Sequence, residues 1–248
     1  MSGSYGVFAS VYDLLTEDVE YRQRGEYFLS LVKKYGGKET GTLLDLACGT
    51  GSLSEAFAEH GYNVIGADIS EDMLSIAESK RMQSGSDIKY ICQDMRELEL
   101  GQAVDVTVCA LDSLNHLDGI EDVKSVFERV FDHTAEGGLF LFDMNTLYKH
   151  HEILADNTFV FDEEDVYLVW QNFLDGDRVD ICLDFFMPDK NGKYERYSED
   201  FSETAYPADD ITALLKECGF MVLGVYGENT LEPPKSDCER VIFAAKKE

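Results

Sequence analysis

Three acidic residues stand in or at the ends of apolar runs in the first part of this 248-residue chain, and they are suited to hold a nucleoside. Asp45 lies in a leucine-rich run, and Asp68 lies near the end of the run 63–70 (NVIGADIS). Asp94 is the second-last residue of the run 88–95 (IKYICQDM). A carboxylate at the tip of a strand can accept both hydroxyls of a ribose, and a neighbouring one can accept from an exocyclic amine. We therefore expect these three acids to meet at one edge of a sheet.

A glycine-rich turn follows the first of these acids. The segment 42–55 (TLLDLACGTGSLSE) is an apolar strand that ends in a turn bracketed by Gly49 and Gly51 and then enters a helix. Glycine allows a ligand to approach the backbone closely. Ser52 and Glu55 have the spacing of a capping box, which would point free N–H groups at a bound carboxylate or phosphate. The alternative is a tight connection that binds nothing.

A nicotinamide dinucleotide is the competing ligand for such a turn. Its fingerprint needs a third glycine or alanine at the start of the helix, and this chain has Ser54 there. The departure favours a ligand without a pyrophosphate.

Strands and helices alternate to about residue 146, which predicts a parallel sheet covered on both faces. From 158 to 206 apolar and polar residues alternate instead, with turn signals at Asp175-Gly176 and Asn191-Gly192, which predicts an antiparallel insertion. The remaining expected elements are strands at 104–111, 138–144, 221–227 and 239–246, and helices at 207–219 and after a capping box formed by Asp118 and Glu121.

These motifs resemble those of the class I S-adenosylmethionine-dependent methyltransferases. The resemblance rests on 45–51 (DLACGTG), 66–70 (GADIS) and 93–96 (QDMR), and it extends over nearly the whole chain. It implies an α/β fold with a doubly wound, seven-stranded, mostly parallel sheet, the Rossmann-like methyltransferase fold, and S-adenosylmethionine as cofactor. The resemblance places the cofactor against Tyr12, Asp45, Ala47, Gly49, Gly51, Asp68, Ile69, Asp94, Met95 and Leu111.

The same resemblance divides the chain into a cofactor-binding part, 1–150 and 207–248, and an insertion at 151–206 that forms a substrate lid or a dimer contact. This placement is similar to small-molecule methyltransferases that act on amino sugars and amino acids. Their motif near the end of the lid is matched by 199–206 (EDFSETAY), except that Phe201 and Thr204 replace the common histidine and arginine.

Aromatic residues are frequent in the first 30 positions, and residues 1–35 are expected to form a helical N-terminal lid. Tyr5, Phe8, Tyr12 and Asp13 match a lid helix of the resembled family. The ring of Tyr12 could stabilise a sulfonium by a cation–π contact, whereas Phe8 and Phe28 are expected to pack against the sheet edge.

The candidates for the acceptor side are 111–117 (LDSLNHL) and 143–145 (DMN), which follow the fourth and fifth strands. His116 is our choice for a base or orienting group, with Tyr12 beside the reacting methyl group. The alternative is that the polar residues of 111–117 cap the helix that follows.

Composition restricts the partners. With 49 acidic and 21 basic residues the formal charge is −28, which disfavours nucleic acid and anionic lipid. The six cysteines contain no CxxC pair, so we expect buried reduced thiols, no metal site and a cytoplasmic protein. No signal peptide or membrane span is evident, and we expect a monomer or homodimer.

The sequence thus predicts methyl transfer from S-adenosylmethionine to N or O of a small-molecule acceptor by in-line displacement. Two alternatives stay open: a non-catalytic S-adenosylmethionine-binding partner subunit and, with less support, a nicotinamide-dependent oxidoreductase.

Overall fold

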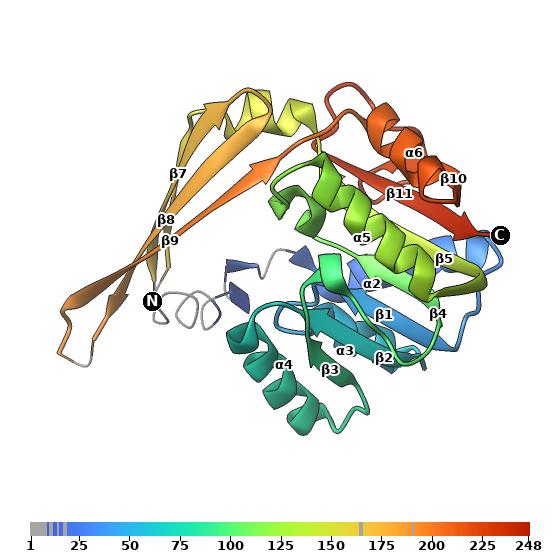
Figure 1. Cartoon of the computed structure of the whole chain (residues 1–248). Helices are drawn as coiled ribbons and strands as arrows, with labels where there is room; N and C mark the ends of the chain where they lie inside the picture. The colour runs from blue at the N-terminus through green and yellow to red at the C-terminus, as the bar shows by residue number, and fades with distance from the viewer. Residues whose placement is uncertain (1–8, 10–11, 14, 17–18, 164–165, 190) are drawn as a thin grey trace.

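The computed structural model describes residues 9, 12–13, 15–16, 19–163, 166–189 and 191–248, and it contains one large and one smaller sheet (Figure 1). The large sheet has seven strands in the order β10-β11-β5-β4-β1-β2-β3. All neighbouring strands in it are parallel except β11, which is antiparallel to β5 and β10. The strands are β1 (Thr42–Leu46), β2 (Asn63–Asp68), β3 (Lys89–Cys92), β4 (Val104–Cys109), β5 (Thr134–Asn145), β10 (Phe220–Gly227) and β11 (Arg240–Lys247).

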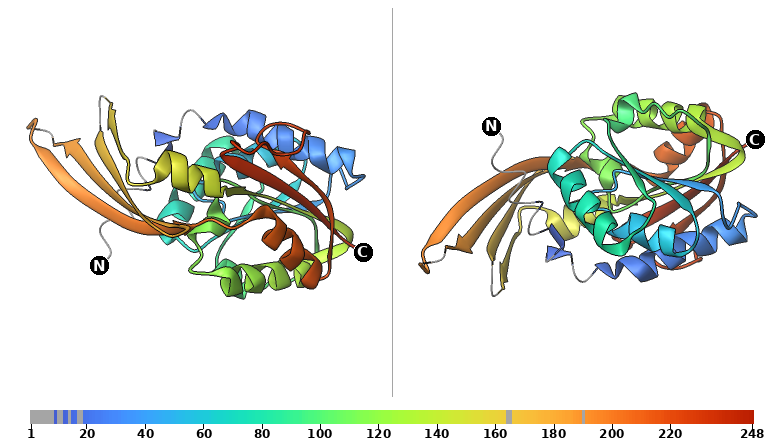
Figure 2. Two further views of the ribbon diagram at one scale, coloured as in Figure 1. Left: turned by 90° about the horizontal axis from the view of Figure 1, so that it is seen from above. Right: turned by 90° about the horizontal axis from the view of Figure 1, so that it is seen from below.

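Apolar side chains cover both faces of this sheet, which explains the continuous apolar runs of its strands. On one face the core includes Phe127 and Ile211 from the helices, and on the other it includes Phe28 and Phe57. Figure 2 shows α2 on one face and α5 with α6 on the opposite face. The helices are α2 (Tyr21–Lys34), α3 (Ser52–Glu59), α4 (Glu71–Ser84), α5 (Ile120–His133) and α6 (Ala208–Glu217), with short turns η2 (Met95–Glu97), η3 (Ser113–His116) and η4 (Lys149–Leu154).

The order of the strands reverses between β1 and β4. From β1 the chain proceeds outward to β2 and β3, and it then returns to β4 on the other side. Loops that leave two such strands in opposite directions open a crevice at their carboxyl ends, and ligands of α/β sheets bind there. The fold therefore places the loops after Leu46 and Cys109 side by side.

Two predicted helix caps are wrong. The helix α3 begins at Ser52 and its N-cap is Gly51, with φ of 76°, so Ser52 lies inside the helix and forms no capping box. The helix α5 begins at Ile120 with Gly119 as its N-cap, so Asp118 does not cap it. Glycine at these positions leaves the N-terminal N–H groups without a side-chain acceptor of the cap residue.

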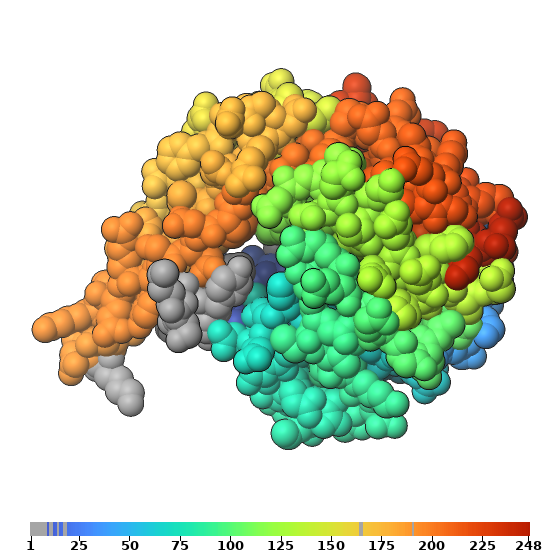
Figure 3. Space-filling view, viewed as in Figure 1, coloured from blue at the N-terminus to red at the C-terminus, as the bar shows by residue number. Residues whose placement is uncertain are grey.

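The predicted antiparallel insertion is confirmed as the second sheet, which has four strands in the order β6-β7-β8-β9. They are β6 (Thr158–Asp162), β7 (Tyr167–Asp175), β8 (Arg178–Pro188) and β9 (Tyr194–Thr204). Figure 3 shows this sheet, in orange and gold, arching away from the body of the molecule. Val179, Ile181, Leu183 and Phe185 of β8 form the centre of its own apolar core.

Three further expectations can be compared with the structure. Phe28 is fully buried in the core, as predicted, whereas Tyr5 and Phe8 lie outside the described residues. All six cysteines are free thiols, but Cys92 is exposed because it ends the edge strand β3, so the expectation that all are buried is wrong. Among the described helices, none combines the length and the apolar character needed to cross a membrane.

Candidate active site

A pocket lies at the point where the strand order reverses. Its wall comes from the loops after β1 and β4 and from the N-terminal segment. The residues that line it are Tyr12, Tyr21, Asp45, Ala47, Cys48, Gly49, Thr50, Ser52, Leu53, Ala110, Leu111 and Ser113.

The backbone around this pocket is held in an unusual conformation. Ala47, Leu111 and Asp112 have positive φ values of 60°, 61° and 52°, although none of them is glycine. Such conformations cost of order 1–3 kcal/mol each and persist where the surroundings enforce them, most often at functional sites. Both loops at the pocket therefore need contacts that hold them in this conformation.

Gly49 and Asp68 hold the turn after β1 to the end of β2. The Gly49 N–H donates to Asp68 Oδ2 at 2.8 Å, and the Ser70 N–H donates to Oδ1 at 2.9 Å. Burial raises the pKa of Asp68, and these N–H donors oppose the rise. Each carboxylate oxygen has a further lone pair, so Asp68 can also accept from a hydroxyl of a ligand. A Cβ at Gly49 would meet no atom within 4 Å, so the backbone there faces open space.

Gly51 is required by packing as well as by its φ value. A Cβ on Gly51 would collide with the Tyr90 hydroxyl and lie 2.9 Å from Ala77 Cβ. The same Tyr90 ring lies 2.6 Å from the position of a Cβ on Gly66. Glycines of the first two motifs therefore accommodate one tyrosine from β3.

Asp45 does not point at the pocket as a free carboxylate. It is buried within β1 and accepts a hydrogen bond from the Ser54 hydroxyl. Burial raises its pKa to about 7, although the Ser54 donor opposes the shift. Ser54, which departs from the dinucleotide fingerprint, thus has a structural partner.

The residues expected to contact the adenine ring lie at the ends of β2 and β3. Ile69 is 65% exposed, although it is a large apolar residue, and Met95 is half-buried at the start of η2. Asp94 caps η2 and accepts from the Arg96 guanidinium, with Nη2 to Oδ2 at 2.6 Å. The side-chain bond from Arg96 lowers the pKa of Asp94. A base that reached Asp94 would have to share this carboxylate with Arg96.

Asp13 connects the N-terminal segment to the glycine turn. Its Oδ1 accepts from the Thr50 hydroxyl at 2.6 Å, and its Oδ2 pairs with Lys80 Nζ at 2.6 Å. Lys80 also donates to the Ser52 hydroxyl at 2.6 Å. Tyr12 is thereby held over the pocket, where burial raises its pKa well above the usual value.

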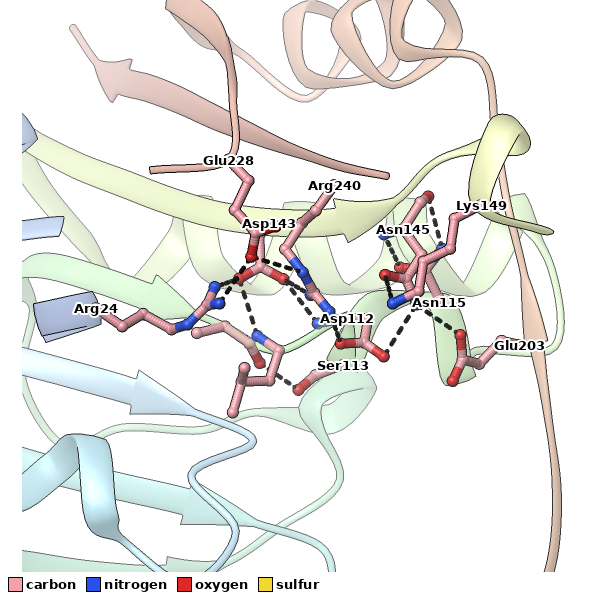
Figure 4. A network of polar contacts seen from close by, with 12 residues as sticks. Arg24, Asp112, Ser113, Asn115, Asp143, Asn145, Lys149, Glu203, Glu228 and Arg240 are labelled. Carbon is pink, nitrogen blue, oxygen red and sulfur yellow. Dashed lines mark hydrogen bonds and ion pairs between the residues drawn. The ribbon is translucent and has the colours of Figure 1, made fainter. Parts of the chain in front are cut away.

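Asp143 on β5 organises the loop after β4 (Figure 4). Its Oδ2 accepts from the Leu111 N–H at 3.0 Å, and its Oδ1 accepts from the Asp112 N–H at 2.7 Å. The carboxylate is fully buried and pairs with Arg240 Nη1 at 2.6 Å and with Arg24 Nη1 at 3.4 Å. Both arginines also reach Glu228. Asp143 therefore fixes the positive φ values of Leu111 and Asp112.

His116 lies one short turn beyond the pocket. Its side chain is 41% exposed, and its Nε2 is 3.9 Å from Oε1 of the buried Glu203 on β9. The ring packs on Phe201 of the same strand, with centroids 5.0 Å apart. The insertion therefore supplies one side of the surroundings of His116.

Asn145 brings two carboxylates together next to His116. Its Nδ2 donates to Asp112 Oδ2 at 3.1 Å and to Glu203 Oε2 at 2.8 Å. Burial would raise the pKa of Asp112, but the charges of Arg240, Lys149 and His116 outweigh it and hold that pKa below its usual value. Asp112 is therefore ionised, and this side of the site presents negative charge.

Ligand atoms of Asp112, His116 and Glu203 lie within 4.8 Å of one another, a spacing that a metal ion could use. However, Asp112 Oδ1 already pairs with Arg240 Nη2 at 2.7 Å, and Asn145 occupies Oδ2. A metal ion would have to displace these donors, so the donor set fits a metal poorly.

The capping alternative for 111–117 is wrong for Asn115 and Asp112. Asn115 is buried and donates to the carbonyls of Asn145 and Thr204, while its Oδ1 accepts from the Asn145 N–H. Asp112 pairs with Arg240 instead of capping α5.

Sequence reasoning did not find Arg24, Arg240 or Lys80, and it named Asp13 only as part of the match to a lid helix, without its partners Thr50 and Lys80. The one local signal was Arg240, a charged residue directly before the apolar run 241–245 of β11. The others become recognisable only when distant segments meet.

Comparisons with known proteins show similarity to methyltransferases over nearly the whole chain. The family model described as "Methyltransferase domain" matches residues 43–138. "Putative methyltransferase YqeM" of Bacillus subtilis is 37% identical over 246 residues, which cover 98% of this chain and 97% of that protein. The crystal structure of an S-adenosylmethionine-dependent methyltransferase from Clostridium acetobutylicum has a TM-score of 0.90 and 32% identity, and the match covers 98% of both chains. A dTDP-3-amino-3,6-dideoxy-alpha-D-glucopyranose N,N-dimethyltransferase of Streptomyces fradiae is 30% identical over 136 residues, which cover 54% of this chain and 51% of that protein.

Replacing Asp143 by Ala should destabilise the fold by about 3–5 kcal/mol, because it leaves two buried arginines and two N–H groups without their acceptor. Urea denaturation followed by circular dichroism measures this loss. The exposed Asp175 at the end of β7 serves as control, and Asp175→Ala should change stability by less than ~0.5 kcal/mol. Equal stabilities of the two variants would contradict the role of Asp143.

Proposed function

The chain belongs to the S-adenosylmethionine-dependent methyltransferases, and we propose that it methylates a nitrogen atom of a small-molecule amine. The cofactor would supply a methyl group bonded to a sulfonium sulfur, and the acceptor atom would attack that methyl carbon in line with the C–S bond while the neutral thioether leaves as S-adenosylhomocysteine. The observation that carries the choice of an amine is the pair of carboxylates, Asp112 and Glu203, held together by Asn145 beside His116.

Features in and beside the pocket at the reversal point support cofactor binding there. Open space at Gly49, the remaining lone pairs of Asp68 and the exposed side chain of Ile69 offer what an amino acid, a ribose and an adenine respectively require. In our proposal Ala47, Gly49 and Gly51 form the cradle of the turn, Asp68 accepts from the ribose hydroxyls, and Ile69 with Met95 covers the adenine. Leu111 and Tyr12 close the pocket. Asp45 supports the turn from inside β1. Asp94, which also accepts from Arg96, accepts from the exocyclic amine of the adenine.

An amine reaches such a site as an ammonium ion. Two carboxylates attract the cation, and the oxygen lone pairs that Arg240 and Asn145 leave free accept its N–H groups in charge-assisted, and therefore strong, hydrogen bonds. The amine must then be neutral to attack, and His116 is placed to accept its proton. Glu203 would stabilise the imidazolium that results.

The insertion is proposed to form the acceptor side of the site. Phe201 and Glu203 come from β9 and stand against His116, which belongs to the loop after β4. The resemblance to a sugar N,N-dimethyltransferase supports an amine acceptor, although that match covers only about half of each chain. A protein that only bound the cofactor would not need this arrangement.

Proximity and alignment supply most of the rate in our proposal. Holding two reactants in the attacking geometry can contribute ~7–11 kcal/mol, which exceeds the contribution of proton transfer. His116 therefore assists the reaction, and its removal should slow the enzyme without abolishing turnover.

S-adenosylmethionine or S-adenosylhomocysteine at submillimolar concentration should raise the melting temperature, whereas NADH should not, because a ligand that binds only the folded state stabilises it.

Asp68→Ala should weaken cofactor binding by about 1–3 kcal/mol, since the ribose loses a charged acceptor. Calorimetric titration measures the dissociation constant, with Asp175→Ala as the control. Stabilisation by NADH alone, or an unchanged constant in Asp68→Ala, would contradict the assigned pocket.

A panel of small amines, phenols and carboxylic acids, scored by release of S-adenosylhomocysteine, should show turnover with amines. Mass spectrometry of the product identifies the methylated atom. Turnover confined to phenols would favour O-methylation at the same site. A lack of turnover with every acceptor, together with tight cofactor binding, would favour the non-catalytic alternative.

His116→Ala should lower kcat with an active amine by roughly 10- to 1,000-fold while the cofactor dissociation constant stays nearly unchanged, because His116 meets the acceptor and not the adenosine. Unchanged turnover in His116→Ala would show that the acceptor lies elsewhere.

A further inference from the structure

His150 is a fully buried histidine near the acceptor side, and the mechanism above does not use it. It lies on η4, and its ring is 0% exposed. Its Nδ1 lies 2.9 Å from the carbonyl oxygen of Asp177. A carbonyl oxygen can only accept, so Nδ1 carries a proton and donates it to Asp177.

The other ring nitrogen faces a carboxylate. His150 Nε2 is 3.6 Å from Glu203 Oε2, and it has no hydrogen-bond partner among the described residues. In the neutral ring with its proton on Nδ1, Nε2 is an acceptor, and a carboxylate oxygen is an acceptor too. Two acceptors facing each other away from water repel, so one proton must belong to this pair.

The surroundings indicate which of the two groups holds that proton. Glu203 Oε2 accepts a hydrogen bond from Asn145 Nδ2 at 2.8 Å, which favours the ionised carboxylate. Lys149, the cation on the same short helix, donates to Asn145 Oδ1 at 3.1 Å. Asp112 pairs with Arg240, and His151 pairs with the Asp177 side chain at 3.0 Å. These neighbouring charged groups therefore have other partners, and His150 is the group that faces Oε2.

We propose that His150 is a protonated, buried counter-ion that keeps Glu203 ionised on the acceptor side. Glu203 then stands between two imidazoles, with Oε2 facing the buried His150 and Oε1 facing the partly exposed His116 at 3.9 Å. His150 is not among the residues that line the pocket, so it is a positioning residue that acts through Glu203.

The consequence for the reaction rests on the proposed function. When His116 takes the proton of the amine, it becomes a cation, and an ionised Glu203 stabilises that cation. A neutral, protonated Glu203 would not. His150 thus holds the charge that the proton-accepting step needs, without exchanging its own proton with the acceptor.

The protonation state itself can be measured without any acceptor. In protein labelled with 15N-histidine at pH 7.5, the two ring nitrogens of His150 should both show the shifts of protonated nitrogens. The His150→Gln variant assigns the signals. In Glu203→Gln the same ring should be neutral, with a proton on Nδ1 only. A neutral His150 in the wild type would overturn the proposal, whatever the acceptor panel shows.

Activity provides the second measurement, with the adjacent His151 as matched control. His150→Gln should lower kcat by about 10- to 100-fold, part of the 10²–10⁴ typical of assisted proton transfer, and leave cofactor affinity unchanged. His151→Gln removes an exposed histidine from the same short helix and should retain wild-type kcat. Circular dichroism checks that both variants fold. Wild-type kcat in a folded His150→Gln, or an equal loss in both variants, would also overturn the assigned role.

Discussion

The site depends on one buried carboxylate, that of Asp143. It lies at the end of β5 and accepts from two N–H groups of the loop after β4, while Arg240 of β11 and Arg24 of α2 neutralise it. Burying a charge of this kind is expensive unless every lone pair has a donor, and here the donors come from three elements that are distant in the sequence. The geometry of the loop that carries Asp112 and His116 is therefore coupled to the packing of α2 and β11. The loop proposed to carry the catalytic histidine is held in a strained conformation because a satisfied ion network prevents it from relaxing.

The parts of the site that could be predicted from the sequence are those whose partners are close along the chain. The turn with Gly49 and Gly51 and the acid Asp68 follow short strands, and parallel strands bring their carboxyl ends to one edge of a sheet. The seven-stranded sheet and the antiparallel insertion followed from the period of the apolar residues. The predictions failed where two local solutions compete. Ser52 and Asp118 are residue types that commonly cap helices, but the neighbouring glycines Gly51 and Gly119 occupy the N-cap positions.

The ion network could not be predicted in the same way. Arg24 and Arg240 are separated from Asp143 by 119 and 97 positions, and no periodicity connects them. The same holds for Asp13, whose partners Thr50 and Lys80 belong to different elements. With 49 acidic residues in the chain, composition alone gives no reason to choose Asp143 or Glu203 over an exposed acid. Burial distinguishes them, and burial is a property of the fold.

Glu203 lies near the end of β9 that is remote from the tip of the insertion, but the strand register set at that tip decides which way its side chain points. Side chains alternate between the two faces of a strand, so a shift of pairing by one residue exchanges the faces. In the observed register Glu203 pairs with Val179 and Phe201 pairs with Ile181, which puts them on the inner face. A shift by one residue would present Ser202 and Asp200 to His116 instead. The length of the connection between β8 and β9, at the other end of this hairpin, therefore determines which side chains stand against His116. In related chains, a connection that is one residue longer or shorter would change the side chains that stand against His116, without any substitution in β9 itself.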